Sequence, residues 1–158
     1  MIEIINQNLK IEEGIINVLP GLDILPSRIE NALLDPNIML KRFPLEHLYK
    51  DMLNPLKEKY DVILIDCPPA LGSSVTAATL ASDRVISPVT PSEFSLTGLE
   101  ITSKEIENIE KQFKVSITLC PLLNEYDART TLSPDTMRML VSHPKFERTL
   151  LRSVVRKS

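Results

Sequence analysis

The chain has 158 residues, of which 43% are apolar, and this is enough for one domain with a hydrophobic core. Its formal charge of −3 gives no overall sign of nucleic-acid or membrane binding, and no apolar run is long enough to span a bilayer. Cys67 and Cys120 lie in or beside apolar runs, which favours buried free thiols in a reducing compartment over a disulfide framework. These features predict a soluble, cytoplasmic protein.

The first sixty residues give signals of unequal strength. Residues 1–21 are compatible with a short strand or with an irregular helix. Residues 22–27 predict a short strand that ends in a loop. Apolar residues at helical spacing predict a helix over residues 45–56, which Pro55 should kink or divide.

The clearest strand signal lies at residues 61–66. Residues 62–65 are all apolar, which predicts a strand buried on both faces, as in a parallel sheet, and Pro68 and Pro69 end it because neither can donate to a ladder. Asp66 therefore falls at the carboxyl end of the strand, where open α/β sheets bind their ligands. The pattern alone leaves two interpretations open: Asp66 holds Mg²⁺ beside a nucleotide phosphate, directly or through water, or it caps a turn.

The rest of the chain alternates between helix and strand signals. Helices are predicted over residues 73–81 and 97–113, and a third begins at Ser133 with Met137, Leu140 and Val141 on its buried side. Strands are predicted over residues 84–89 and 116–123. The alternation predicts an α/β fold, with a mostly parallel sheet flanked by helices and joined by right-handed crossovers. No repeat or linker interrupts it, so we expect one domain.

Basic residues gather near the end of the chain. Residues 144–158 contain one acid, Glu147, and five basic residues: Lys145, Arg148, Arg152, Arg156 and Lys157. Such a cluster is either a solvated tail or a phosphate-binding patch.

Five segments, in order, resemble the ParA/Soj/MinD group of deviant Walker ATPases. The segment DVILIDCPP at residues 61–69 resembles the Walker B strand of that group, which ends in D-x-P-P. The other four segments are GLDILPS at 21–27, ASDRVISPV at 81–89, SEFSLTGL at 92–99 and NEYDART at 124–130. The matches extend over roughly residues 20–155 and favour the plasmid and chromosome partition branch. The resemblance implies a P-loop NTPase-like, three-layer α/β/α fold.

The resemblance also implies roles at the nucleotide site. Asp66 would be the catalytic Walker B carboxylate and would bind Mg²⁺ through water. Asn124 would lie near the adenine base, and Arg152 and Ser153 would belong to the loop that flanks it. That loop departs from the I-P-R-N pattern of the family, with Leu151 in place of Pro and Ser153 in place of Asn.

Basic residues are also expected to bind DNA. The resemblance implies this role for Arg129, which matches a position that supports non-specific DNA binding in the family, and Arg152 and Arg156 would extend the same patch. Arginines of this kind engage phosphates without reading bases, so their affinity should fall steeply with salt. The alternative for Arg129 is an ion pair with Asp127 or a neighbouring acid.

The phosphate-binding loop of the family, K-G-G-x-x-G-K-T/S, has no counterpart in these 158 residues. None of the four glycines lies in a G-x-x-x-x-G-K arrangement, and the family aspartate that orients the attacking water is also missing. We therefore expect residues 1–158 to be a single partial ParA-like domain that lacks the N-terminal P-loop strand and does not hydrolyse ATP alone. The missing strand should leave unpaired backbone, which a partner or a rearranged N-terminus would have to cover.

The resemblance implies a partition ATPase. In the full-length protein, ATP and Mg²⁺ would drive homodimerisation, and the dimer would bind DNA non-specifically on the nucleoid until a ParB-like partner stimulated hydrolysis. The isolated chain is not expected to hold ATP or Mg²⁺ tightly. The alternative is a truncated, non-catalytic module that binds DNA or a partner protein. A MinD-like role at the membrane is disfavoured because the C-terminal region shows no clear amphipathic helix.

Overall fold

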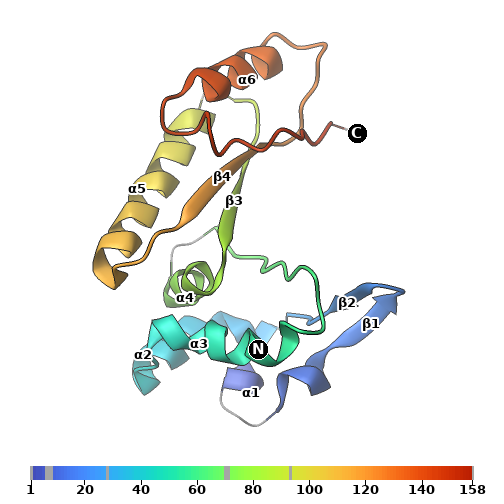
Figure 1. The fold of residues 1–158 in the computed structure, drawn as a ribbon, viewed down its shortest axis with the longest axis vertical. Coiled ribbons are helices and arrows are strands. Elements are labelled where there is room, and N and C mark those ends of the chain that lie inside the picture. Colours follow the sequence, from blue (N-terminus) through green and yellow to red (C-terminus); the bar gives the residue numbers. More distant parts are fainter. Residues whose placement is uncertain (1, 6–8, 28, 70–71, 93, 158) are drawn as a thin grey trace. The chain divides into compact units, whose positions relative to one another are not determined.

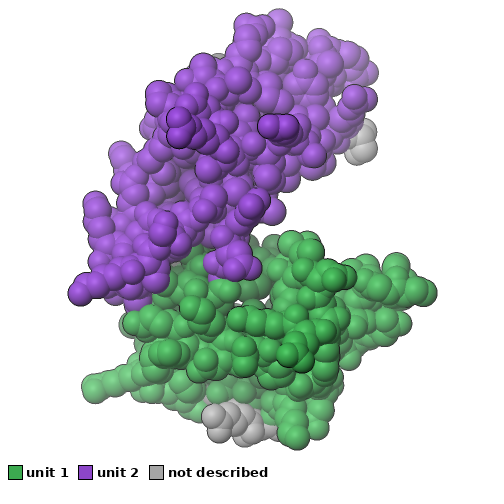
Figure 2. Space-filling view, in the orientation of Figure 1, with its two compact units in different colours: residues 1–81 green, residues 82–158 purple. Residues whose placement is uncertain are grey.

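The computed structural model describes residues 2–5, 9–27, 29–69, 72–92 and 94–157. Glu93, part of one segment that resembles the family, lies outside this range, as do residues 1, 6–8 and 158. The chain forms two compact units, residues 1–81 and residues 82–158 (Figure 2). The single domain expected from the sequence stays a prediction.

The first unit combines short helices with a small hairpin (Figure 1). The ambiguous N-terminal segment contains both kinds of structure, since helix α1 (Ile2–Ile5) and a 3-10 turn (Ile11–Gly14) precede strand β1 (Ile16–Leu19). Strand β2 (Leu22–Ile24) pairs antiparallel with β1, and Gly21 in the connecting turn has a φ of 80°, which favours glycine. The strand predicted at 22–27 is thus confirmed in its first half.

Three longer helices complete the first unit: α2 (Leu34–Lys41), α3 (Leu45–Leu53) and α4 (Ser73–Ala81). The predicted break at Pro55 is confirmed, because α3 ends at Leu53 and a 3-10 turn (Asn54–Leu56) follows. The Asp35 carboxylate caps α4 by accepting a hydrogen bond from the Ser74 N–H at 2.7 Å. A Cβ on Gly72 would lie 2.0 Å from the same carboxylate, so a side chain there would displace Asp35 from this capping position.

The second unit is built on a parallel pair of strands, β3 (Arg84–Val89) and β4 (Thr118–Leu123), with Arg84 opposite Thr118 and Val89 opposite Leu123. Helix α5 (Ser95–Phe113) connects them and lies along the sheet (Figure 1). Helix α6 (Leu132–Ser142) follows β4. This β–α–β order confirms the predicted α/β class with parallel strands.

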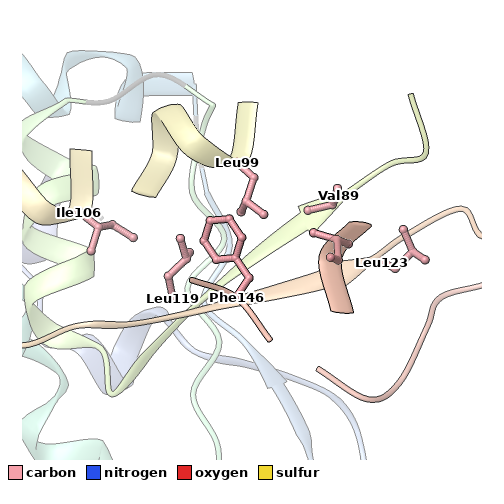
Figure 3. Packing of buried hydrophobic residues seen from close by; sticks show 7 residues of the cluster. Val89, Leu99, Ile106, Leu119, Leu123 and Phe146 are labelled. Atoms are coloured by element: carbon pink, nitrogen blue, oxygen red, sulfur yellow. The ribbon is translucent and has the colours of Figure 1, made fainter. Parts of the chain in front are cut away.

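The core of the second unit lies between the sheet and its helices. Leu99 and Ile106 of α5 pack against Leu119 and Leu123 of β4, and the Phe146 ring lies near Leu99 and Leu119 (Figure 3). The helix predicted over residues 97–113 is therefore confirmed, with Leu99 and Ile106 on its buried side. On α6, Leu140 is buried as predicted, but the prediction for Val141 is wrong, because that side chain is exposed.

Residues 61–66 depart most from the sequence prediction. The structure assigns no strand there, and Val62 and Leu64 are 70% and 82% exposed. Ile65 packs against the core formed by α2, α3 and α4 and ties the segment to the first unit. The prediction of a buried parallel strand is wrong for this structure, because no neighbouring strand among the described residues pairs with the segment. Its apolar side chains are typical of a strand inside a sheet, but no strand in the described part of the chain pairs with it through hydrogen bonds. Its backbone is therefore irregular.

Candidate functional site

The carboxyl end of β4 gathers several residues singled out by the sequence. The N–H of Asn124 donates to the Val89 carbonyl at 2.9 Å and ties this residue to the carboxyl end of β3 as well. Glu125 then takes the left-handed conformation, with a φ of 53°. This conformation is uncommon for a residue with a side chain, and it turns the chain immediately after the strand.

The C-terminal segment, residues 151–157, runs beside β4 and continues past its end. The N–H groups of Leu151 and Val155 donate to Pro121 and Leu123 of β4, both at 2.9 Å. Beyond the strand, Tyr126 forms a parallel bridge with Arg156. Through this bridge Arg156 lies beside a residue that follows Asn124 by two positions. In the sequence, Asn124 and Arg156 are 32 positions apart. The structure therefore places both predicted residues at one end of the sheet.

Arg129 forms the ion pair that was its alternative interpretation. Its Nε and Nη2 donate to the two carboxylate oxygens of Asp127 at 2.9 and 2.8 Å, and its backbone N–H also donates to Oδ1 at 3.0 Å. The Asp127 N–H is in turn bonded to the buried Ser133 hydroxyl of α6 at 3.1 Å. The Arg129 side chain is nevertheless 88% exposed. Asp127 thus fixes its orientation and leaves its outer edge accessible.

The same ion pair predicts a pH dependence. Hydrogen bonds from the Arg129 side chain and backbone lower the pKa of Asp127 from 3.8 to about 2. Because the folded pKa is lowered, the stabilisation is present above pH 4 and is lost as pH falls through 2. We expect Arg129→Ala to raise the Asp127 pKa toward its ordinary value, measured by NMR titration of the carboxyl carbon. An unchanged pKa in that variant would mean that Arg129 is not the dominant cause.

Arg152 and Ser153, the other residues predicted near the base, are both exposed. Arg152 lines a pocket together with Arg84 and Arg148, away from the turn at Asn124. Sequence reasoning did not single out Arg84. It lies more than sixty positions before Arg152, and only the strand register brings the two together.

Asp66 belongs to the first unit and follows the irregular segment 61–65. It is exposed, and no group of three or more possible metal-ligating side chains occurs among the residues that the structure describes. Desolvation raises the pKa of the neighbouring Cys67 thiol, and the Asp66 carboxylate adds to this rise. Cys67 is exposed and Cys120 buried, so the prediction of two buried thiols holds only for Cys120. Among the described residues, Asp66 therefore stands without a cluster of further possible metal ligands, and its metal role stays a prediction.

Among the described residues, no helix has the length and apolar character needed to cross a bilayer.

Comparison with known proteins gives the family. A family model described as "AAA domain" matches residues 1–119, about three quarters of the chain. The chain belongs to this AAA domain family. A ParA family protein of Mycoplasma pneumoniae is 28% identical over 138 residues, which cover 87% of this chain and 50% of that protein. The sporulation initiation inhibitor protein Soj of Bacillus subtilis is 33% identical over 113 residues, with 71% of this chain and 44% of Soj covered.

Two solved structures have a fold similar to that of this chain. The cobyrinic acid a,c-diamide synthase of Mycobacterium smegmatis, solved with a bound ATP analogue and magnesium, has a TM-score of 0.85 at 24% identity and is matched over 99% of this chain and 63% of its own. A putative plasmid partition protein of Borrelia burgdorferi bound to AMPPNP has a TM-score of 0.72 at 25% identity, over 92% of this chain and 58% of its own. The resemblance to ParA-type P-loop ATPases and the α/β fold are confirmed. The chain spans about half the length of the curated relatives it matches.

Proposed function

We propose that the chain belongs to a ParA-like partition ATPase, within a protein that also contains a phosphate-binding loop. In that whole protein, ATP and Mg²⁺ promote dimerisation, the dimer binds DNA non-specifically, and a ParB-like partner stimulates hydrolysis and release. The ParA family relatives support this proposal, as does the solved partition protein with bound AMPPNP. The observation that carries the DNA-binding step is the accessible guanidinium of Arg129, held in one orientation by Asp127.

The chemistry of Arg129 suits a phosphate backbone. A guanidinium that is paired on one edge keeps N–H donors on the other, and these can engage a phosphate oxygen without reading a base. Arg156 follows Val155, whose hydrogen bond to β4 holds that part of the C-terminal segment against the sheet. Both arginines are exposed. They are proposed to contact neighbouring phosphates, with Asp127 positioning the first of them.

DNA binding gives the direct test. We expect a random-sequence duplex to bind the whole protein in the presence of ATP with an affinity that falls with salt, and Arg129→Ala to reduce the slope of log K against log salt by about 1. Fluorescence anisotropy at several salt concentrations measures both quantities. Arg138→Ala is the matched control, because Arg138 is also exposed and paired with an acid, Asp135, at 3.0 Å. Equal slopes for the wild type and Arg129→Ala would contradict the proposed contact.

The residues present fit only the metal side of a nucleotide site. Asp66 offers one carboxylate for Mg²⁺, but the 158 residues contain no glycine and lysine loop to hold the phosphates. Positioning and charge neutralisation supply most of the catalysis of phosphoryl transfer. The chain alone therefore cannot align a phosphate with an attacking water. The proposed role of Asp66 needs the loop from elsewhere in the whole protein.

The purified chain is accordingly expected to show no ATP turnover above a blank without protein. Phosphate release is measured with DNA present and absent, and the whole protein with its phosphate-binding loop serves as the positive control. Turnover by the chain comparable to that of the whole protein, and lost in Asp66→Asn, would contradict this prediction.

A second candidate function is a non-catalytic module that binds DNA or a partner. It is favoured by one contrast: the second unit is packed around a core that supports Arg129, whereas the segment before Asp66 lacks strand pairing. The DNA experiment separates the two candidates. Binding that is unchanged by ATP in the whole protein supports the module, and binding that requires ATP supports the partition ATPase.

A further inference from the structure

A pocket in the second unit lies at the opposite end of the strands from Asn124. Its volume is about 240 Å³, and its lining combines three arginines, two threonines and a buried cysteine with two leucines of the same loop. The polar lining residues are Arg84, Thr118, Cys120, Arg148, Thr149 and Arg152. All of them belong to residues 82–158, so the pocket is complete within one compact unit.

The strand register explains why these residues meet. Arg84 and Thr118 begin β3 and β4 and are direct partners, and Cys120 lies two positions further on the same face. The other face carries Leu119 and Leu123, which pack into the core. The loop 148–152 crosses the strand edge, where the Leu151 N–H donates to the Pro121 carbonyl at 2.9 Å. Arg148 and Arg152 are thereby brought to the face that Arg84 occupies.

The charge of the pocket is unbalanced. No carboxylate lines it, and among the described residues no ion pair joins Arg84 or Arg152 to an acid. Arg148 has one acidic neighbour, Glu147, with its Nε 3.9 Å from the carboxylate oxygen. Three guanidinium groups around one concave surface raise the local positive potential, and a bound anion lowers that repulsion.

We propose that this pocket binds the phosphate group of a small phosphorylated ligand. Guanidinium groups present planar pairs of N–H donors that match phosphate oxygens. Thr118 and Thr149 also line the pocket, and each carries a hydroxyl group that can donate. The volume is below the roughly 300 Å³ at which pockets for drug-sized ligands begin, so it suits a phosphoryl group with few further atoms. The convergence of the arginines on one hollow favours a compact anion over an extended nucleic-acid backbone.

This site is separate from the one proposed to bind DNA. Thr118 and Leu123 are the two ends of β4, and five residue steps of about 3.3 Å put roughly 16 Å between them. Asn124, Arg129 and Arg156 belong to the carboxyl end, whereas Arg84 and Thr118 belong to the amino end. Arg152 gains a role here that differs from the base-flanking role implied by the family resemblance.

Titration with pyrophosphate at low ionic strength tests the proposal on the whole chain. We expect saturable shifts in the amide NMR signals of Thr118, Cys120 and Thr149, and a dissociation constant that calorimetry can measure. Arg84→Gln and Arg152→Gln should each weaken binding by about tenfold, because each removes a charge-assisted pair of hydrogen bonds. Arg138→Gln is the matched control and should leave the affinity unchanged, since Arg138 belongs to α6 and does not line the pocket.

Two results would overturn the proposal. The first is pyrophosphate binding that does not saturate, or that is weakened equally by Arg138→Gln and Arg84→Gln. Either result would report a general attraction to positive charge. The second is competition by DNA: a duplex displaces pyrophosphate, and Arg84→Gln lowers the affinity for that duplex as much as Arg129→Ala does. This result would make the pocket part of a nucleic-acid surface. Circular dichroism checks that each variant is folded. If Arg84→Gln does not fold, Arg152→Gln alone is sufficient for the test.

Discussion

Replacing Phe146 by alanine is expected to lower the free energy of unfolding of the second unit by about 3–5 kcal/mol. The Phe146 ring is 1% exposed and belongs to the cluster that contains Leu99, Leu119 and Leu140. Its loss removes apolar contacts of the sheet with α5 and α6 together and leaves a cavity that this packing cannot easily close. An effect of this size is a large part of the stability of a typical domain.

Val141→Ala provides the matched control for this prediction. Val141 lies on α6 and looks like a core residue in the sequence, but its side chain is 54% exposed. Its replacement is expected to change stability by less than about 0.5 kcal/mol. Urea denaturation gives both values, and hydrogen exchange of the β3 and β4 amides assigns the change to the second unit. Similar losses for the two variants would contradict the packing described for α6.

Much of the second unit could be predicted because its signals are local. The spacing of Leu99, Ile106 and Ile109 defines a helix face by itself. The apolar run at 116–123 predicts a strand without reference to any partner, and β4 forms over residues 118–123 of it. The break at Pro55 is a property of proline alone. These elements have the structure that the sequence predicts because local preference and tertiary packing agree.

The site residues could be predicted from the sequence only in part. Motif resemblance was enough to select Asn124 and Arg129, and the basic cluster at residues 144–158 selected Arg156. The structure brings all three to one end of the sheet. No sequence pattern could indicate that Arg84 and Arg152 share a pocket, because that contact depends on the pairing of β3 with β4 and on a loop that crosses the strand edge. The capping of α4 by Asp35 likewise joins residues 39 positions apart.

The segment 61–66 shows the limit of a local strand signal. A strand is stable only when its backbone groups are paired, and this pairing is a property of the neighbours and not of the segment. Val62 and Leu64 have the composition of a sheet interior, yet they are exposed because no strand among the described residues forms a ladder with them. An apolar segment whose backbone groups are unpaired is a template for pairing with another chain.

Charged substitutions in this segment should therefore suppress self-association of the chain. We expect the double variant Val62→Lys, Leu64→Lys to stay soluble at concentrations where the wild type forms large species, measured by light scattering and analytical ultracentrifugation. Stability should change by less than about 0.5 kcal/mol, because both side chains are largely exposed.

A second double variant identifies the cause of the effect. Met39 and Leu40 on α2 are as exposed as Val62 and Leu64, and their replacement by lysine adds the same charge. Their backbone lies within a helix and offers no free strand edge. If unpaired strand backbone drives association, only the lysines at 62 and 64 will reduce it. An equal reduction by both variants would instead assign association to exposed apolar area and net charge, and segment 61–66 would have no special role in it.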